Sequence, residues 1–200
     1  EIAAMKIDKL PLDGEWEKVF GRPDLWERWF ISGDSASGKS TFVMLLAKKL
    51  CEYGKVLYEC YEERLNGSFQ DRTARLRMEE VDGRFQAVKG EPIEELAARL
   101  AKPKSPPFVI IDSVQYLNTR RFDRLKALLL DRFPRKAFFF VSQSYKGTPK
   151  GRLADDIKYD CGVKVNTQGY RAYCQGRYID DAAAYYTIWE EGAAKYYLNE

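Results

Sequence analysis

The sequence contains no histidine, and this absence excludes two large classes of active site. A chain without histidine has neither a histidine general base nor a histidine-ligated metal centre. It does have four cysteines, but no two of them form a C-x-x-C pair: they are Cys51, Cys60, Cys161 and Cys174. We therefore expect free, buried thiols, with no zinc site and no disulfide framework.

A long hydrophobic run is also missing. No apolar stretch approaches the roughly 20 residues that a membrane-spanning helix needs, and no signal peptide is visible at the start. We expect a soluble, cytoplasmic protein without a membrane partner. The net charge is only +3, which does not by itself indicate a nucleic-acid-binding protein, so any basic surface must be local.

What the sequence does contain is enough apolar material for a substantial core. Of its 200 residues, 45% are hydrophobic and 14% are aromatic, so we expect one compact α/β domain over residues 1–200. Residues 1–28 are expected to pack across the first strand, with Trp16, Phe20 and Trp26 as core anchors. Stacking of one of these rings on a nucleotide base is the alternative.

The clearest chemical signal lies in residues 33–41, which read G-D-S-A-S-G-K-S-T and contain the pattern G-x-x-x-x-G-K-[ST]. The apolar run 29–31 before it predicts a strand, and apolar residues at helical spacing over 43–50 predict a helix after it. Glycines let backbone N–H groups turn toward an anion, and a helix N-terminus adds partial positive charge. We predict a nucleotide-binding loop made of Gly33, Asp34, Ser35, Ala36, Ser37, Gly38, Lys39, Ser40 and Thr41.

The same loop predicts a cofactor, Mg²⁺-ATP. Lys39 is expected to reach the β- and γ-phosphates, and the Ser40 hydroxyl is expected to ligate Mg²⁺. A second metal ligand is predicted at Asp112, which closes the apolar run 108–112. Such a run is typical of a parallel strand buried on both faces, and an acid at its end fits the Walker B role.

Two further polar groups follow predicted strands. Glu62 and Glu63 come after the strand 55–60, where an α/β nucleotide site keeps its polar chemistry; solvated loop charges are the alternative. Gln143 closes the strand 136–143 and either senses the γ-phosphate or merely ends a strand. Residues 144–158 then predict a mobile basic loop that carries Lys146, Lys150 and Arg152.

The remaining expected elements change from mainly helices to short strands along the chain. Before the basic loop we expect helices over 68–80, 92–102 and 119–133 and a strand over 85–88. After residue 159 the pattern predicts short alternating strands without helical crossovers, and hence antiparallel additions to the sheet, over 161–166, 170–176, 183–190 and 194–198.

Taken in order, these motifs resemble the RecA superfamily of P-loop ATPases, especially the cores of RadA/Sms recombination proteins and DnaB-like helicases. The loop 33–41 is similar to the RadA-type loop G-D-P-G-I-G-K-S-T and departs from it at Ser35, Ala36 and Ser37. Residues 109–115, V-I-I-D-S-V-Q, resemble the family's Walker B segment.

Three roles are implied by this resemblance. Residues 56–63 look like the segment V-L-Y-V-S-G-E-E, whose first acid polarises the attacking water, so this role falls on Glu62. Residues 140–143 match the strand that ends in a sensor glutamine, here Gln143. Residues 172–178 resemble a stretch whose basic pair reaches a neighbouring subunit's nucleotide; Arg177 keeps the arginine, whereas Gln175 stands in place of the lysine.

The resemblance implies a RecA-like fold, with a mainly parallel sheet flanked by helices and antiparallel C-terminal strands. It further implies ATP hydrolysis, self-association into a ring or filament, and action on DNA, with single strands favoured and contacts from Lys146, Lys150 and Arg152. A helicase-like motor and an accessory factor in recombination, replication or mobile-element transfer both fit. Two alternatives remain: an ATP-dependent protein switch or scaffold, and a small-molecule kinase. The kinase is disfavoured because the arginines of 68–80 are expected on a helix rather than in a lid.

Overall fold

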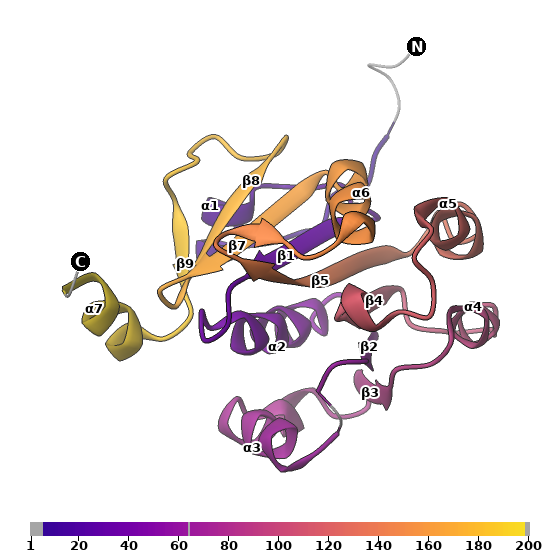
Figure 1. The fold of residues 1–200 in the computed structure, drawn as a ribbon, viewed down its shortest axis with the longest axis horizontal. Coiled ribbons are helices and arrows are strands. Elements are labelled where there is room, and N and C mark those ends of the chain that lie inside the picture. The colour runs from indigo at the N-terminus through magenta and orange to yellow at the C-terminus, as the bar shows by residue number, and fades with distance from the viewer. Residues whose placement is uncertain (1–5, 64, 199–200) are drawn as a thin grey trace.

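The computed structural model describes residues 6–63 and 65–198, so residues 1–5 and 199–200 of the expected terminal segments lie outside the described residues. Its centre is one sheet with the strand order β3-β2-β4-β5-β1-β7-β8-β9, and β6 pairs with β5 (Figure 1). The strands are β1 (Trp29–Gly33), β2 (Val56–Cys60), β3 (Phe85–Lys89), β4 (Phe108–Asp112), β5 (Ala137–Tyr145), β6 (Thr148–Pro149), β7 (Val163–Gln168), β8 (Arg171–Gly176) and β9 (Tyr185–Thr187).

Helices cover both faces of this sheet. They are α1 (Gly14–Phe20), α2 (Lys39–Leu50), α3 (Gly67–Arg75), α4 (Ile93–Leu100), α5 (Phe122–Leu125), α6 (Arg152–Asp160) and α7 (Glu190–Leu198). Shorter turns are η2 (Met78–Val81), η3 (Val114–Tyr116) and the π-helical η4 (Lys126–Leu130), which continues α5. Apolar side chains of α1, α2 and α3 pack on one face, and those of α4, α5 and α6 pack on the other.

The central strands form because their apolar runs can be buried on both faces at once. Every residue of β1, β2 and β4 is buried, which is typical of parallel strands between two helical layers. Six neighbouring strands of the sheet are parallel to one another: β3, β2, β4, β5, β1 and β7. β8 is antiparallel to β7, β9 to β8, and β6 to β5. The expectation of a mainly parallel sheet with antiparallel C-terminal strands is thus confirmed.

Parts of the C-terminal expectation were wrong. β7 pairs with β1 in parallel, and the chain reaches it through α6, a helical crossover that begins inside the segment 144–158 expected to be a loop. Residues 194–198 belong to α7 and not to a strand. Both helices bury little: within α6 only Ala154 and Ile157 are buried, so its charged residues hide the apolar spacing that would have revealed it.

The N-terminal aromatic residues pack as core anchors. The Trp16 ring lies 4.5 Å from that of Tyr186 and 6.0 Å from that of Phe42, measured between ring centroids, and Phe20 is fully buried. These contacts join α1 to α2 and β9, so Trp16 and Phe20 serve the core, as expected. The four cysteines are free and buried, which also agrees with the sequence.

Candidate nucleotide-binding site

The phosphate loop connects the end of β1 to the first turn of α2. Gly38, directly before the helix, has φ of 92°, a left-handed conformation that side chains other than glycine rarely adopt. No side chain in the described part of the chain caps the N-terminus of α2, so its first N–H groups face the loop. A helix start of this kind is suited to an anion.

The loop is braced from behind by the turn between β7 and β8. The Ser37 hydroxyl lies 2.7 Å from the Thr167 hydroxyl, and the Tyr170 backbone N–H donates to the Ser37 carbonyl at 3.2 Å. Ser37 therefore points away from the cavity that its neighbours line. The sequence predicts that Ser37 binds the nucleotide, but its side chain serves the brace; only its backbone remains available to a ligand.

In front of the loop lies a cavity of about 510 Å³. Every predicted loop residue except Ser37 lines it, and so do Glu62, Gln143 and Lys150 from other parts of the chain. An adjoining cavity of about 550 Å³ adds Asp112 and shares Ser40 and Glu62 with the first. Strand ends far apart in the sequence thus meet at the phosphate loop, because the parallel strands all point their C-terminal ends to this edge.

The strand order puts Gln143 between the loop and the metal-binding candidate. β5 lies between β1 and β4, with Gly33 level with Gln143 in the β1–β5 register. The Gln143 Nε2 donates to Glu62 Oε1 at 2.7 Å. The backbone N–H of Glu62 donates to the Asp112 carbonyl at 3.2 Å, which holds the segment after β2 over the end of β4. Glu62, Asp112 and Gln143 are therefore neighbours.

Asp112 is a buried carboxylate that lines the second cavity and accepts one side-chain hydrogen bond from the described residues. It is 5% exposed, and the Tyr58 hydroxyl donates a hydrogen bond to its Oδ2. Burial raises the pKa of Asp112, while the hydrogen bond from Tyr58 and the charge of Lys39 act to lower it. Burial, and then the charge of Asp112, raise the pKa of Tyr58 well above its usual value, so the phenol remains a donor.

The oxygen donors around the second cavity fit Mg²⁺. The Ser40 hydroxyl and the Asp112 carboxylate line this cavity together, and Glu62 adds a further carboxylate at its wall. Hydroxyl and carboxylate oxygens are the ligands that this ion prefers, and it usually keeps several waters besides one or two carboxylates. Ser40 and Asp112 are the residues that would hold the ion.

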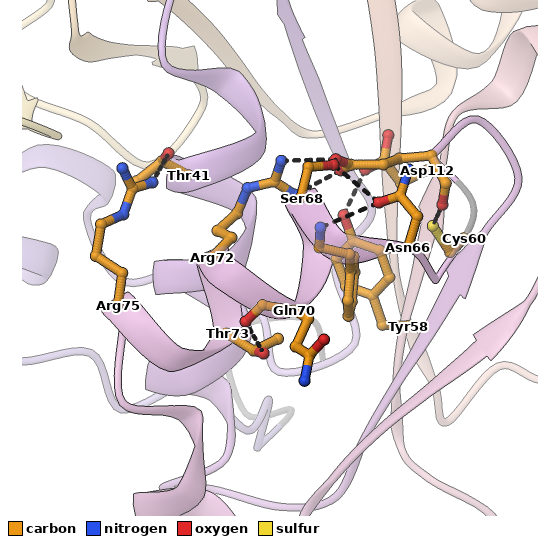
Figure 2. A network of polar contacts seen from close by, with 12 residues as sticks. Thr41, Tyr58, Cys60, Asn66, Ser68, Gln70, Arg72, Thr73, Arg75 and Asp112 are labelled. Atoms are coloured by element: carbon orange, nitrogen blue, oxygen red, sulfur yellow. Dashed lines mark hydrogen bonds and ion pairs between the residues drawn. The ribbon is translucent and has the colours of Figure 1, made fainter.

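Two arginines of α3 line the nucleotide cavity, and the sequence did not reveal them. Arg72 donates to both Glu63 oxygens, at 2.6 and 3.0 Å, and Arg75 Nη2 donates to the Thr41 hydroxyl at 3.3 Å (Figure 2). Burial by itself raises the pKa of Glu63, but the hydrogen bonds from Arg72 and Ser68 outweigh it and the net shift is downward. Helical spacing predicts the helix; it does not predict which face turns toward the loop.

Gln115 is a third residue that the sequence did not single out. Its Nε2 donates to the Ser142 hydroxyl at 2.8 Å and to the Lys150 carbonyl at 2.9 Å, and its Oε1 accepts from the Gln143 backbone N–H at 3.1 Å. One side chain thus ties η3 to the tip of β5 and to the hairpin that follows. Its only sequence signal is its place in the Walker B segment.

The basic segment after Gln143 is a hairpin followed by a helix, and not the expected loop over 144–158. β5 turns back into β6, and α6 begins at Arg152. We name residues 144–152 the basic hairpin. Its Gly147 N–H donates to Asp34 Oδ1 at 3.2 Å, and its Lys150 N–H donates to the Gln143 carbonyl at 3.0 Å. Two backbone contacts therefore link the basic hairpin to the nucleotide cavity.

The three predicted DNA-binding residues have different surroundings within the basic hairpin. Lys150 lines the nucleotide cavity, whereas Lys146 lines a neighbouring cavity behind the phosphate loop. Arg152 lines neither; its side chain is 94% exposed and lies 3.9 Å from Asp156.

Arg177 is remote from the nucleotide cavity of its own chain. It follows β8, which runs antiparallel to β7, so it lies at the opposite end of the sheet from the phosphate loop. There it lines a cavity with Asp160 and Arg28. A role in its own site is excluded by this position, and the predicted role in a neighbour's site stays a prediction.

No model of a known protein family matches the chain, and no curated protein matches its sequence. Solved structures match its fold. The KaiC-like protein PH0186 of Pyrococcus horikoshii OT3 superposes with a TM-score of 0.58 at 14% identity, over 90% of this chain and 92% of that one. The flagellar accessory protein FlaH of Methanocaldococcus jannaschii gives 0.64 at 12% identity, over 90% and 93%.

The chain has a RecA-like P-loop fold. The resemblance inferred from the motifs is thereby confirmed at the level of the fold. In the part of this RecA-like chain that the structure describes, no helix is long and apolar enough to cross a membrane.

Proposed function

We propose that the chain is a Mg²⁺-dependent ATPase whose site is the cavity in front of the phosphate loop. The observation that carries this proposal is that four side chains line this cavity together. They are Lys39 and Ser40 of the loop and the hydrogen-bonded pair Glu62 and Gln143. A carboxylate held by an amide at 2.7 Å, across from a phosphate-binding lysine, is placed to act on a water beside the terminal phosphate.

The residues divide the work of hydrolysis. Backbone N–H groups of the loop and Lys39 bind the phosphates, and Ser40 and Asp112 hold Mg²⁺, which when bound neutralises phosphate charge. Glu62 takes a proton from water as the water oxygen bonds to the γ-phosphorus. The bond from that phosphorus to the bridging oxygen breaks, and its electron pair leaves with ADP. Gln143 keeps Glu62 oriented through the hydrogen bond from its Nε2 to Glu62 Oε1.

The partner we propose is DNA, with single strands favoured, for a helicase-like motor or an accessory factor in the cytoplasm. Lys146, Lys150 and Arg152 are exposed cations, and Tyr145 beside them is 66% exposed. The Lys146 ammonium lies 5.6 Å from the centre of the Tyr145 ring. Cations for phosphates beside an aromatic ring for bases are what sequence-tolerant binding of single strands requires.

The test is an ATPase assay on the wild type and on Glu62→Gln, with and without single- and double-stranded DNA, beside a sizing column run with a non-hydrolysable ATP analogue. Glu62→Gln should keep ATP binding and lose roughly 100-fold or more in kcat, because proton transfer matters in the transition state and not in the ground state. Glu63→Gln is the matched control; a larger loss there would assign water activation to Glu63. Wild-type protein that neither binds nor hydrolyses ATP would refute the proposal.

The same assay distinguishes two other candidate functions from an ATPase that acts on DNA. Slow hydrolysis that DNA does not change would favour an ATP-dependent protein switch or scaffold. A small-molecule kinase is favoured by one observation, the presence of Arg72 and Arg75 in the cavity wall, where an anionic acceptor would find cations. A kinase forms ADP without free phosphate and only when an acceptor is added, whereas an ATPase releases phosphate in water alone.

A further inference from the structure

α3 is held at the wall of the nucleotide cavity by a helix cap, an aromatic contact and an ion pair. The Asn66 side chain caps it by accepting from the Phe69 N–H at 3.2 Å, and the Phe69 ring packs edge-on against Tyr58 of β2, 5.7 Å between centroids. One turn later, Arg72 is held by both oxygens of Glu63. Residues three apart share a helix face, so Arg75 follows Arg72 on the side that looks toward the phosphate loop (Figure 2).

Among the residues that the structure describes, Arg75 differs from the neighbouring arginines in having no acidic partner. Arg72 is paired with Glu63, and Arg77 is paired with Glu80 at 2.8 Å. The described part of the chain offers Arg75 no carboxylate within ion-pair distance, and its guanidinium donates instead to the neutral hydroxyl of Thr41. An unneutralised cation therefore lies at the wall of a cavity whose proposed ligand is a polyanion.

The contact with Thr41 places the Arg75 guanidinium beside the first turn of α2, where the phosphates of the proposed ligand would bind. Thr41 directly follows Lys39 and Ser40 in the first turn of α2, and all four residues line the same cavity. A guanidinium 3.3 Å from the Thr41 hydroxyl is within one side-chain rotation of any phosphate bound at this turn. Guanidinium groups bind phosphate oxygens through two parallel hydrogen bonds, which a hydroxyl does not offer.

We propose that Arg75 is a phosphate-binding residue of the nucleotide site, supplied in cis by α3. It exchanges the Thr41 hydroxyl for phosphate oxygens of the bound nucleoside triphosphate and so adds a second cation to Lys39. The inference rests on the proposed nucleotide site and deepens it. It also means that one chain carries a guanidinium for its own nucleotide, independently of Arg177 and of any neighbouring subunit.

The experiment compares Arg75→Ala and Arg75→Lys with Arg77→Ala, a matched control on the next turn whose charge is paired outside the cavity. ATP affinity is measured by titration calorimetry, and turnover by phosphate release. Arg75→Ala should weaken ATP binding about 10-fold or more, the usual effect of removing one charge-assisted hydrogen bond. Arg75→Lys should lose less, because it keeps the charge, and Arg77→Ala should stay within about twofold of the wild type.

A mixing experiment tests the cis assignment. When Arg75→Ala chains are mixed with Lys39→Ala chains, no chain carries both cations, so turnover should not recover. Recovery would overturn the cis assignment. Equal ATP affinity and turnover in Arg75→Ala and Arg77→Ala, with normal binding by the wild type, would overturn the inference and leave the ATPase proposal intact. A wild type that binds no ATP would overturn both.

Discussion

Two basic segments, α3 and the basic hairpin, lie beside the phosphate loop, and their charged side chains differ in surroundings. On α3, Arg72 has a side chain only 13% exposed and paired with Glu63, and Arg75 faces the cavity. On the basic hairpin, Lys146, Lys150 and Arg152 are exposed, and only Lys150 lines the nucleotide cavity. The two arginines of α3 therefore line the nucleotide cavity, whereas two of the three cations of the basic hairpin lie outside it.

The difference follows from how each segment is anchored. α3 is tied by a helix cap, an aromatic contact and an ion pair, so the helix and Arg72 are held in place, and Arg75 lies on the side of the helix that faces Thr41. The basic hairpin is tied through the backbone N–H groups of Lys150 and Gly147, which donate to the Gln143 carbonyl and to Asp34, so its charged side chains take no part in these two contacts. Cations that are held in place can be aimed at one anion, whereas mobile ones suit a flexible polyanion.

The largest effect is expected at Lys39. The loss of ATP turnover in Lys39→Ala is the reference against which variants of both basic segments are compared. Lys39→Ala should abolish ATP turnover and weaken ATP binding, because the cation that neutralises the β- and γ-phosphates is removed. Phosphate release and a binding titration measure the effect, and circular dichroism checks the fold. Hydrolysis at the wild-type rate by a folded Lys39→Ala protein would contradict the assignment of the site.

Arg177 tests whether a third arginine, far from both segments, acts on a neighbouring chain. Arg177→Ala should bind ATP and hydrolyse it poorly, since an arginine finger is typically worth about 10³-fold or more in kcat. Mixing it with Lys39→Ala chains should restore turnover, in contrast to the Arg75→Ala mixture. If a strictly monomeric wild type is active and the mixture stays inactive, Arg177 is part of the sheet surface only.

The basic hairpin should govern binding to DNA without governing hydrolysis. Replacing Lys146, Lys150 and Arg152 together by alanine should lower affinity for single-stranded DNA and reduce the salt slope by up to about one unit for each DNA phosphate that is no longer neutralised. Basal ATP hydrolysis should remain. Filter binding over a range of salt concentrations measures both quantities. Unchanged DNA binding in the triple variant, or none by the wild type at low salt with ATP, would favour the protein-scaffold function.

The smallest effect is expected at Gln115, which joins the basic hairpin to the sheet. Gln115→Ala removes three hydrogen bonds and leaves the Gln143 N–H without its side-chain partner. The hairpin should open more often, and trypsin should cleave after Lys146 and Lys150 several-fold faster. Gln70→Ala, on the exposed face of α3, is the control. Equal cleavage of the two variants would show that the backbone contacts alone hold the hairpin.

The phosphate loop, the strand before it and the helix after it could all be predicted from the sequence. These features are local: a glycine-lysine motif, apolar runs and helical spacing are properties of neighbouring residues, and burial on both faces of β1 and β4 requires the runs that the sequence contains. For the same reason Asp112, Glu62 and Gln143 could be assigned to strand ends, and the fold they imply is confirmed.

The other features of the fold and site depend on tertiary packing. It made β7 parallel and 194–198 helical, because strand direction and weakly amphipathic helices depend on what packs against them. It turned Ser37 into a brace, brought Gln143 to Glu62, placed Arg177 at the far end of the sheet, and turned Arg75 toward Thr41. Each of these outcomes depends on which residues distant in the chain meet, and a side chain's direction is set only when its element has packed.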